Sequence, residues 1–326
     1  MKQKVPNIFS FATSELSQDA MFCWLLQWAS PKYTDTDPSL HKLGQEFVRL
    51  LSGKEQDFEI SSIDVGRQWE NIDLWAEIND DMFLVVEDKT GTTIHGGQLS
   101  RYKSSAEKEY GGKRSDIRLT YVKTGNEPLS ILRKVRHAGY RTVCRGEILK
   151  CLSEYDGSNQ LVISFREHLQ ALEDATSSFK VLPERQWGWN AWQGFYMELE
   201  KLLDIKSWDY VANPSGGFLG AWWHFVDAGD VSIYLQFEQG KLCFKIAYEG
   251  DENRSQVRHK FHSLLMSRAK DNFPEIHRPT RFGAGTYMTI AVVDEEDIFG
   301  EGVLNLEDVV NKLKRYEGLL DICATE

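Results

Sequence analysis

The core of this 326-residue chain is encoded in IDLWAEINDDMFLVVEDK, residues 72–89. Residues 72–78 alternate apolar and polar side chains, which is the period of a half-buried strand. Residues 79–81, Asn-Asp-Asp, predict a turn. The next five residues are all apolar, as is typical of a strand buried on both faces. We therefore predict two paired strands, the second of which ends in three charged residues.

Those charged residues are Glu87, Asp88 and Lys89. Because side chains alternate along a strand, Glu87 and Lys89 point to one face and Asp88 to the other, and Asp73 on the paired strand is expected nearby. Two carboxylates and the backbone carbonyl of Asp88 are oxygen ligands of the kind that Mg²⁺ or Mn²⁺ prefers. The set suits metal-dependent phosphodiester hydrolysis, in which Lys89 supports the nucleophile and the transition state. The same residues also occur at ordinary solvated strand ends.

The spacing resembles the PD-(D/E)XK nuclease superfamily: Asp73, then thirteen residues, then Glu87-Asp88-Lys89 as the E-x-K element. Ile72 stands where the family pattern has Pro. The resemblance covers roughly residues 8–175 and implies a restriction-endonuclease-like α/β fold, with a mixed sheet flanked by helices. It also implies that Lys89, Asp73 and Glu87 are catalytic, that Asp73, Glu87 and the Asp88 carbonyl hold a metal, and that this metal is Mg²⁺ or Mn²⁺.

Two flanking features are similar to further parts of the family pattern. Gln98 and Tyr102 reproduce the Q-x-x-x-Y element of the RecB-like and lambda-exonuclease-like branches, and on a helix they share one face. They are expected to position the nucleic acid; a plain helix start after two glycines is the alternative. Glu15 opens a predicted N-terminal helix and matches the place of an additional metal-binding Glu, although the helix dipole favours an acidic residue there in any protein.

Charge is unevenly distributed along the chain. The formal net charge of -11 argues against a protein that coats nucleic acid along its whole length. Residues 101–150, however, contain thirteen Lys and Arg against five Asp and Glu. A basic segment directly after the candidate site is what a phosphate-tracking surface needs, and a solvated helical face is the alternative. DNA is therefore the expected partner, with RNA not excluded.

Cysteine usage and hydropathy indicate the compartment. The five cysteines are odd in number and form no C-x-x-C pair, which favours a reducing compartment and argues against structural zinc. The N-terminus lacks the apolar core of a signal peptide, and no apolar run approaches the length of a membrane span. We expect a cytoplasmic protein without a membrane partner.

Two domains are expected, because the character of the chain changes near residue 180. Residues 1–180 form the nuclease domain, with a strand at Phe58–Val65 and with Leu161–Phe165 and Glu167–Ala175 as its last segments. Residues 181–326 form an acidic α+β accessory domain around a meander of three strands at residues 218–227, 231–238 and 241–248. This domain shows no catalytic set and is a candidate surface for a protein partner or for self-association.

Two alternatives to the nuclease remain open. One is a catalytically silent protein that keeps the nuclease fold and binds nucleic acid or a partner, against which the intact Asp73, Glu87 and Lys89 argue. The other is an interaction protein whose acidic half binds a protein. By analogy, a free-standing nuclease with such an accessory domain suggests a bacterial or phage-defence role, and the Q-x-x-x-Y element favours end-dependent or single-strand cleavage. His95, beside the site, is a further candidate for an assisting role.

Overall fold

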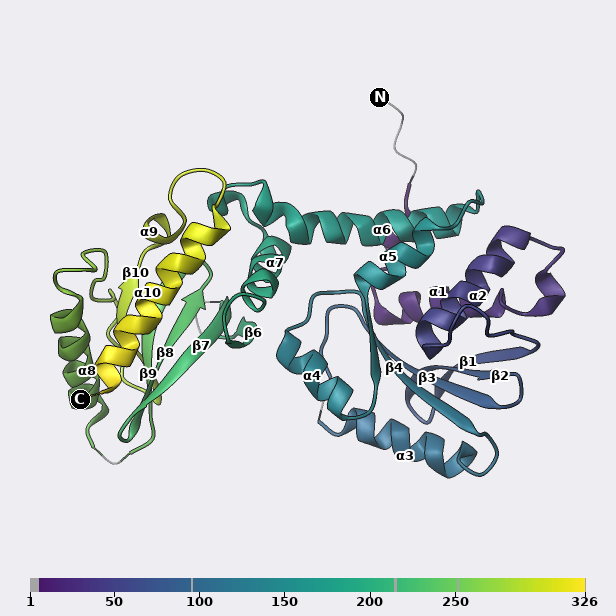
Figure 1. Ribbon diagram of the computed structural model, residues 1–326, viewed down its shortest axis with the longest axis horizontal. Coiled ribbons are helices and arrows are strands. Elements are labelled where there is room, and N and C mark those ends of the chain that lie inside the picture. Colours follow the sequence, from purple (N-terminus) through teal and green to yellow (C-terminus); the bar gives the residue numbers. More distant parts are fainter. Residues whose placement is uncertain (1–5, 95, 214–215, 251, 326) are drawn as a thin grey trace. The chain divides into compact units, whose positions relative to one another are not determined.

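The computed structural model describes residues 6–94, 96–213, 216–250 and 252–325. Its chain divides into two compact units (Figure 1). The first takes in residues 1–127 and 131–174, and the second takes in residues 128–130 and 175–326. Each unit is built on one five-stranded sheet, and each is described below by itself.

The sheet of the first unit is mixed and follows the order β1-β2-β3-β4-β5. The first three strands are antiparallel neighbours, while β3, β4 and β5 run parallel to one another. The strands are β1 Ile63–Trp69, β2 Ile72–Ile78, β3 Met82–Lys89, β4 Asp116–Lys123 and β5 Arg141–Cys144. The hairpin predicted from residues 72–89 is β2 and β3, and every residue of β3 is buried.

Helices cover both faces of this sheet (Figure 1). The main apolar core joins one face to α1, α2, α5 and α6, and a smaller cluster joins the other face to α3. The helices of the unit are α1 Glu15–Gln27, α2 Pro38–Ser52, α3 Gln98–Tyr110, α4 Leu129–His137, α5 Arg145–Ser153 and α6 Gln160–Ser177, the last of which continues into the second unit. The predicted α/β fold with a mixed sheet flanked by helices is confirmed.

The strand predicted at Phe58–Val65 is displaced, because β1 begins only at Ile63. β1 pairs with β2 from Ile63 opposite Ile78 to Trp69 opposite Ile72, across a two-residue turn. Both turn residues have positive φ, as the tight turns of hairpins require. Residues 59–62 are held instead by Asn79, whose side chain bonds to backbone groups of Glu59 and Ser61. The alternation of apolar and polar residues alone could not distinguish this anchoring by a side chain from the backbone pairing of a strand.

The end of the first unit also differs from the prediction. Leu161–Phe165 and Glu167–Ala175 belong to one continuous helix, α6. Val162, Phe165 and Leu169 are buried at helical spacing, and no Gly or Pro interrupts the segment.

The second unit has an antiparallel sheet in the order β10-β9-β8-β7-β6. The strands are β6 Ile205–Val211, β7 Phe218–Ala228, β8 Val231–Glu238, β9 Lys241–Tyr248 and β10 Tyr287–Val293, and the helices are α7 Trp189–Leu199, α8 Arg254–Ala269, α9 Glu295–Phe299 and α10 Leu306–Ala324. The predicted meander is β7, β8 and β9; neither β6 nor α9 was predicted.

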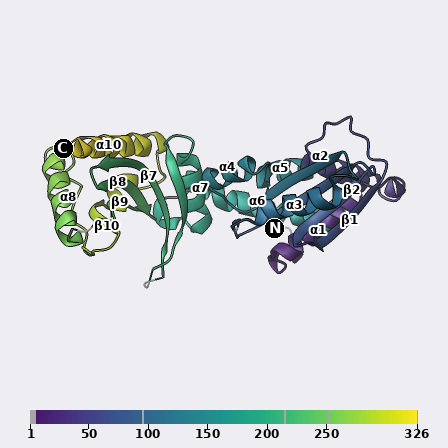
Figure 2. The same ribbon diagram turned by 90° about the horizontal axis from the view of Figure 1, so that it is seen from below.

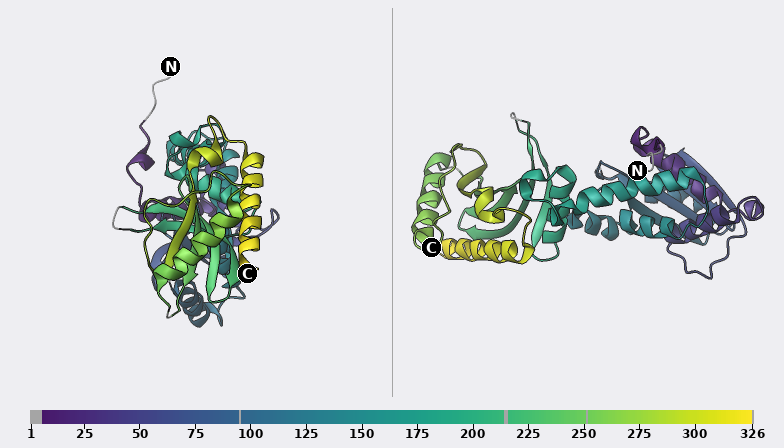
Figure 3. Two further views of the ribbon diagram at one scale, coloured as in Figure 1. Left: turned by 90° about the vertical axis from the view of Figure 1, so that its left-hand side faces the viewer. Right: turned by 90° about the horizontal axis from the view of Figure 1, so that it is seen from above.

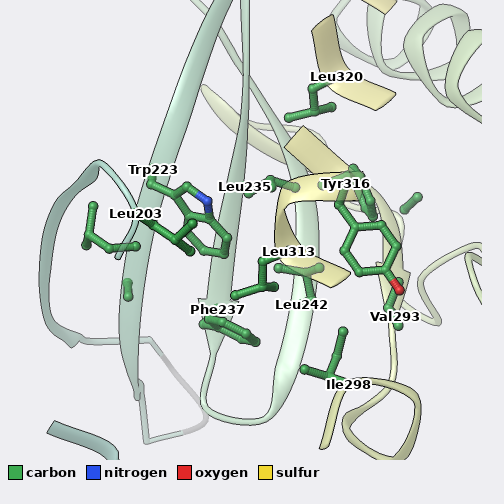
Figure 4. Packing of buried hydrophobic residues seen from close by; sticks show 14 of the residues in the cluster. Leu203, Trp223, Leu235, Phe237, Leu242, Val293, Ile298, Leu313, Tyr316 and Leu320 are labelled. Atoms are coloured by element: carbon green, nitrogen blue, oxygen red, sulfur yellow. The ribbon is translucent and has the colours of Figure 1, made fainter. Parts of the chain in front are cut away.

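The helices of the second unit pack on one face of its sheet. α10 contacts β7 and β8 and also packs beside α8, which in turn contacts β10 (Figures 2 and 3). The core between them is apolar and aromatic: Trp223, Leu235 and Phe237 of the sheet lie against Leu313 and Tyr316 of α10 (Figure 4).

Candidate active site

Alternation along β3 determines where its last three side chains point. The apolar residues of β3 pack alternately against α3 and against the core that contains α1 and α2. Glu87 and Lys89 continue the α3 face, while Asp88 continues the other face and meets α1. All three are at most 5% exposed, so the charges lie inside the fold and not at a solvated strand end.

The Lys89 ammonium lies among three carboxylates. It forms an ion pair with Glu87, lies 3.5 Å from Asp73 Oδ2 and lies 3.9 Å from Glu15 Oε2. It also donates to the carbonyl of Asp88 at 3.1 Å. Three elements, β2, β3 and α1, thus bring acidic groups to one point around a single cation.

Asp73 is the most open of the residues at the end of the β2–β3 pair. Its Oδ2 accepts the backbone N–H of Asp88 at 3.1 Å, which fixes the carboxylate against β3. The side chain of Asp73 remains 27% exposed, whereas that of Glu87 is fully buried. A ligand that approaches from solvent can therefore reach Asp73, and also Glu15 at 30% exposure, before it reaches Glu87.

Gln98 and Tyr102 contact the site from α3. Gln98 Nε2 donates to Glu87 Oε1 at 2.6 Å and to the Tyr102 hydroxyl at 2.9 Å. The i, i+4 spacing that was predicted to place both residues on one helix face does so. Gln98 thus holds the Glu87 carboxylate, and Tyr102 accepts from the same Gln98 amide.

Glu15, the first residue of α1, is fixed by the loop after β3. Its Oε1 accepts the backbone N–H of Thr90 at 3.1 Å and the Thr92 hydroxyl at 2.6 Å. Burial acts to raise the pKa of Glu15, but these two hydrogen bonds and the Lys89 charge outweigh it and lower the pKa overall. Glu15 is therefore ionised at neutral pH.

A buried ion pair anchors the loop that supplies those donors. Lys123, at the end of β4, pairs with Glu127 Oε2 at 2.9 Å and donates to the carbonyl of Thr92. Glu127 also accepts from the Thr93 hydroxyl at 2.8 Å. The loop is thus tied to β4 on one side and to α1 on the other.

The remaining titratable groups of the site respond to burial and to one another. Burial and the charge of Asp73 raise the pKa of Glu87 to about 8, in spite of its bond to Lys89. Burial would lower the pKa of Lys89, but the hydrogen bond and charge of Glu87 outweigh it and raise the pKa. Glu87 therefore keeps its proton to a higher pH than an ordinary glutamate does, and Lys89 keeps its charge.

Residues 6–143 match a family model described as the PD-(D/E)XK nuclease superfamily. The N-terminal unit belongs to this superfamily. No curated protein matches the chain significantly. No solved structure does so either. The matched PD-(D/E)XK segment contains β1 to β4 and both halves of the motif, Asp73 and Glu87-Asp88-Lys89.

PD-(D/E)XK nucleases generally use divalent metal ions, and the oxygen atoms at this site fit such an ion. Glu87 Oε2 is buried and has no hydrogen-bond partner among the residues that the structure describes, and Asp73 is partly open beside it. Within the described residues, no set of three or more His, Cys, Asp or Glu side chains is arranged to hold a metal. The oxygen atoms that this site offers to an ion are those of Asp73, Glu87 and the carbonyl of Asp88. Few protein ligands are typical of Mg²⁺, which keeps several waters and also binds substrate phosphate.

Metal affinity is expected to rise about tenfold per pH unit up to about pH 8 and to level off above it. The reason is that a metal on Glu87 must displace a proton from a carboxyl whose pKa is about 8. Calorimetric titration with Mn²⁺ in buffers of different ionisation enthalpy should show about one proton released per ion at pH 7 and almost none at pH 9. An affinity that does not change between pH 6 and 8 would contradict this assignment.

A polar network behind the motif was not predicted from the sequence. Gln18 Nε2 donates to Asp88 Oδ1 at 2.6 Å, and the Thr124 hydroxyl donates to Gln18 Oε1 at 2.8 Å. Asp19 lies beside Asp88, and burial raises the pKa of both carboxyls, that of Asp19 to about 6. The available signal was Gln18 itself, a polar residue at the start of the apolar stripe of α1.

Replacing Gln18 with Leu should lower the free energy of unfolding by about 1–3 kcal/mol, because Asp88 and Thr124 would each lose a buried hydrogen-bond partner. Urea denaturation of the metal-free protein at pH 7 measures this. Gln170→Ala, at an exposed position of α6, is the matched control and should change stability by less than about 0.5 kcal/mol. Equal effects of the two substitutions would show that the network contributes nothing.

Several cations of the basic segment lie on α3 and α4. Many of the thirteen are neutralised within the fold, for example Arg114 by Glu77 and Arg145 by Glu173. The exposed basic residues that make no ion pair within the described parts of the chain include Arg101, Lys108, Arg133, Lys134 and Arg136. Positive charge that is free to meet phosphate thus remains on the two helices that follow the motif.

Two sequence expectations concern other parts of the chain. His95 lies outside the described residues. Among the helices that the structure describes, none is long and apolar enough to cross a membrane.

Proposed function

We propose that the protein is a metal-dependent nuclease that hydrolyses phosphodiester bonds, in DNA in preference to RNA. The observation that carries this proposal is the convergence of Asp73, Glu87 and Glu15 on the ammonium of Lys89, inside a PD-(D/E)XK fold. Burying ionised groups is costly even when they are paired, so a buried cluster of this kind is expected where it serves a function.

Asp73, Glu87 and the Asp88 carbonyl would hold Mg²⁺ or Mn²⁺, and Glu15 would assist through its charge. When bound, the ion supplies Lewis-acid activation of the phosphate and lowers the pKa of water. The protein's own contribution is positioning: the N–H of Asp88 orients Asp73, and Gln98 orients Glu87. Such preorganisation avoids reorganisation during the reaction.

Lys89 would act directly on the reacting phosphate. It stays charged at neutral pH in spite of its burial, because the hydrogen bond and charge of Glu87 outweigh the effect of burial on its pKa. An ammonium at this place can orient the attacking nucleophile by donating a hydrogen bond to it. It can also neutralise the charge that develops on a phosphate oxygen. Its present contacts with three carboxylates keep it at the point where Asp73 opens to solvent.

The nucleic acid would lie against Tyr102 and along the basic residues of α3 and α4. Exposed Arg and Lys there can follow a phosphate backbone, so binding should weaken with salt. The Q-x-x-x-Y element favours cleavage from ends or in single strands. A bacterial or phage-defence role rests on analogy only, and for residues 181–326 we propose an accessory domain that takes part in partner binding or self-association.

The test is a cleavage panel. Linear and circular, single- and double-stranded DNA, together with RNA, are incubated with the purified protein in Mg²⁺, Mn²⁺ or EDTA. We expect metal-dependent cleavage of DNA, with linear substrates preferred over circular ones. Cleavage of circular DNA at the same rate as linear DNA would contradict end-dependent cleavage and indicate an endonuclease.

The absence of metal-dependent cleavage on every substrate would contradict the proposal in its simple form. Binding of a labelled DNA duplex at 50 and 200 mM salt then identifies the alternative. Salt-sensitive binding without turnover would indicate a silent nucleic-acid-binding fold, whereas no binding would favour an interaction protein.

A further inference from the structure

The C-terminal unit contains a pocket of about 650 Å³ that the nuclease site does not use. It is lined by the residues just before and within β6, by the middle of β7 and by α10. This volume lies within the range of small-molecule sites, about 300–1,000 Å³. Leu203 and Trp223, which form part of its wall, also belong to the core of the unit (Figure 4).

Irregularities in two neighbouring strands meet at this pocket. On β6 the pairing jumps from Ile205 to Ser207, which leaves Lys206 as an extra residue. On β7, two residues, His224 and Phe225, stand between the paired residues Trp223 and Val226, where β8 has only one residue. They form a second bulge. All three bulge residues line the pocket. Bulges redirect side chains and are frequent next to functional sites.

The backbone of His224 supports the same conclusion. Its φ of 52° lies in the left-handed region, which is uncommon for residues other than Gly and is found where surrounding structure enforces it. Its Nε2 is 2.9 Å from Asp321 Oδ1 on α10. The bulge in β7 thus sets the backbone of His224, and the contact with Asp321 on α10 orients its imidazole at the rim of the pocket.

The pocket offers both cations and acceptors. Lys206 and Lys314 line it, are exposed, and make no ion pair within the described parts of the chain. On the same wall, Glu317 accepts the indole N–H of Trp223 at 2.8 Å and retains a second carboxylate oxygen. Asp204 adds a second carboxylate to the lining. Two cations and two carboxylates suit a ligand that combines an anionic group with N–H or O–H donors.

An aromatic ring completes the lining. Phe225 packs on Tyr234, with ring centroids 4.6 Å apart and planes at 11°, yet Phe225 remains 46% exposed. An exposed, rigidly backed ring is a surface on which a flat heterocycle can stack, a contact worth about 1–3 kcal/mol per base in proteins that bind single strands.

We propose that this pocket binds a nucleoside phosphate, with its base on Phe225, its phosphate at Lys206 and Lys314, and its sugar or base donors at Glu317. Lysine is a common phosphate ligand. The choice of a nucleotide over other ring-bearing anions rests on the proposed nuclease function, which releases nucleoside phosphates. The ligand is either a free mononucleotide or the terminal nucleotide of a strand.

The test is calorimetric titration of the full-length Glu87→Gln protein in EDTA, which keeps the candidate active site from contributing through metal. The probes are the four deoxynucleoside 5′-monophosphates, deoxyadenosine, inorganic phosphate and a 5′-phosphorylated octanucleotide. We expect saturable one-to-one binding of at least one monophosphate, and weaker binding, by about tenfold or more, of phosphate or nucleoside alone. Tighter binding of the octanucleotide than of the monophosphates, if the pocket substitutions below abolish the difference, would identify a strand end as the ligand.

Variants locate the binding. The double substitution Lys206→Gln and Lys314→Gln should weaken binding at least about tenfold, and Phe225→Leu should weaken it several-fold. Lys241→Gln and Lys270→Gln, at exposed positions of the same unit outside the pocket, should leave it unchanged. The proposal is overturned if no monophosphate and no octanucleotide binds saturably, or if the double variant binds as well as its parent.

The two proposals fail separately. Cleavage by the wild type together with an empty titration would refute the pocket and leave the nuclease intact. If the protein cleaves no substrate but binds nucleotide in a way that depends on the pocket residues, the proposed nuclease function would be refuted and the proposed nucleotide site would stand. Circular dichroism and melting of each variant exclude unfolding as the cause of lost binding.

Discussion

Glu87→Gln is expected to lower metal-dependent cleavage by about a thousandfold or more. The amide keeps the size of the side chain and can still accept from Gln98, so the fold around it is retained. What it removes is the negative charge that would hold the metal and that pairs with Lys89. Single-turnover cleavage of end-labelled DNA in Mn²⁺ measures the effect, and Glu107→Gln, at an exposed position of α3, is the matched control.

The same substitution should make the metal-free protein more stable at neutral pH. The pKa of Glu87 is about 8 in the folded protein, against an ordinary value of 4.5. As pH rises, the unfolded chain loses this proton first, so the carboxyl costs stability progressively between about pH 4.5 and 8. Glu87→Gln removes this cost, which we expect to be about 4 kcal/mol at pH 7.5 and close to zero near pH 4.

Urea denaturation at both pH values separates the two effects. A variant that is inactive and more stable would have lost a functional group at a site that costs stability. A variant that cleaves as fast as the wild type would show that Glu87 takes no part in the reaction. If the variant is inactive and also less stable than the wild type at pH 7.5, impaired folding would be enough to explain the loss of cleavage.

The hairpin could be predicted because its pattern is local. Alternation in residues 72–78 and the apolar run after the turn reproduce β2 and β3, and the same alternation separates Glu87 and Lys89 from Asp88. The i, i+4 relation of Gln98 and Tyr102 is local as well. Each of these relations depends on residues within one element or one hairpin.

The contacts that complete the site are long-range, and no local period encodes them. Glu15 meets Thr90 and Thr92 only because α1 packs beside the end of β3, and Gln18 reaches Thr124 across 106 positions of sequence. Such contacts depend on how α1 is docked, which its own apolar stripe does not specify. The bulges of β6 and β7 were missed for a related reason, since an extra residue in a strand leaves the composition unchanged.

Replacing Lys89 with Met should lower cleavage by about a thousandfold, yet leave metal binding in place. The ammonium contacts Glu87, Asp73 and Glu15 but is not a metal ligand. Its removal takes away the charge that would stabilise the transition state, and it leaves the carboxylates without their internal counter-ion. A divalent ion then becomes the main counter-charge, so the variant should gain more melting temperature from Mn²⁺ than the wild type gains.

Calorimetric titration and melting with and without Mn²⁺ test both halves of this expectation. Lys103→Met, at a partly exposed position of α3, controls for the loss of a positive charge near the basic surface. Cleavage within tenfold of the wild type would reduce Lys89 to a counter-ion for the buried acids. Loss of Mn²⁺ binding together with cleavage would mean instead that Lys89 holds the carboxylates in place for the metal. Only retained metal binding with lost cleavage assigns the ammonium to the chemical step.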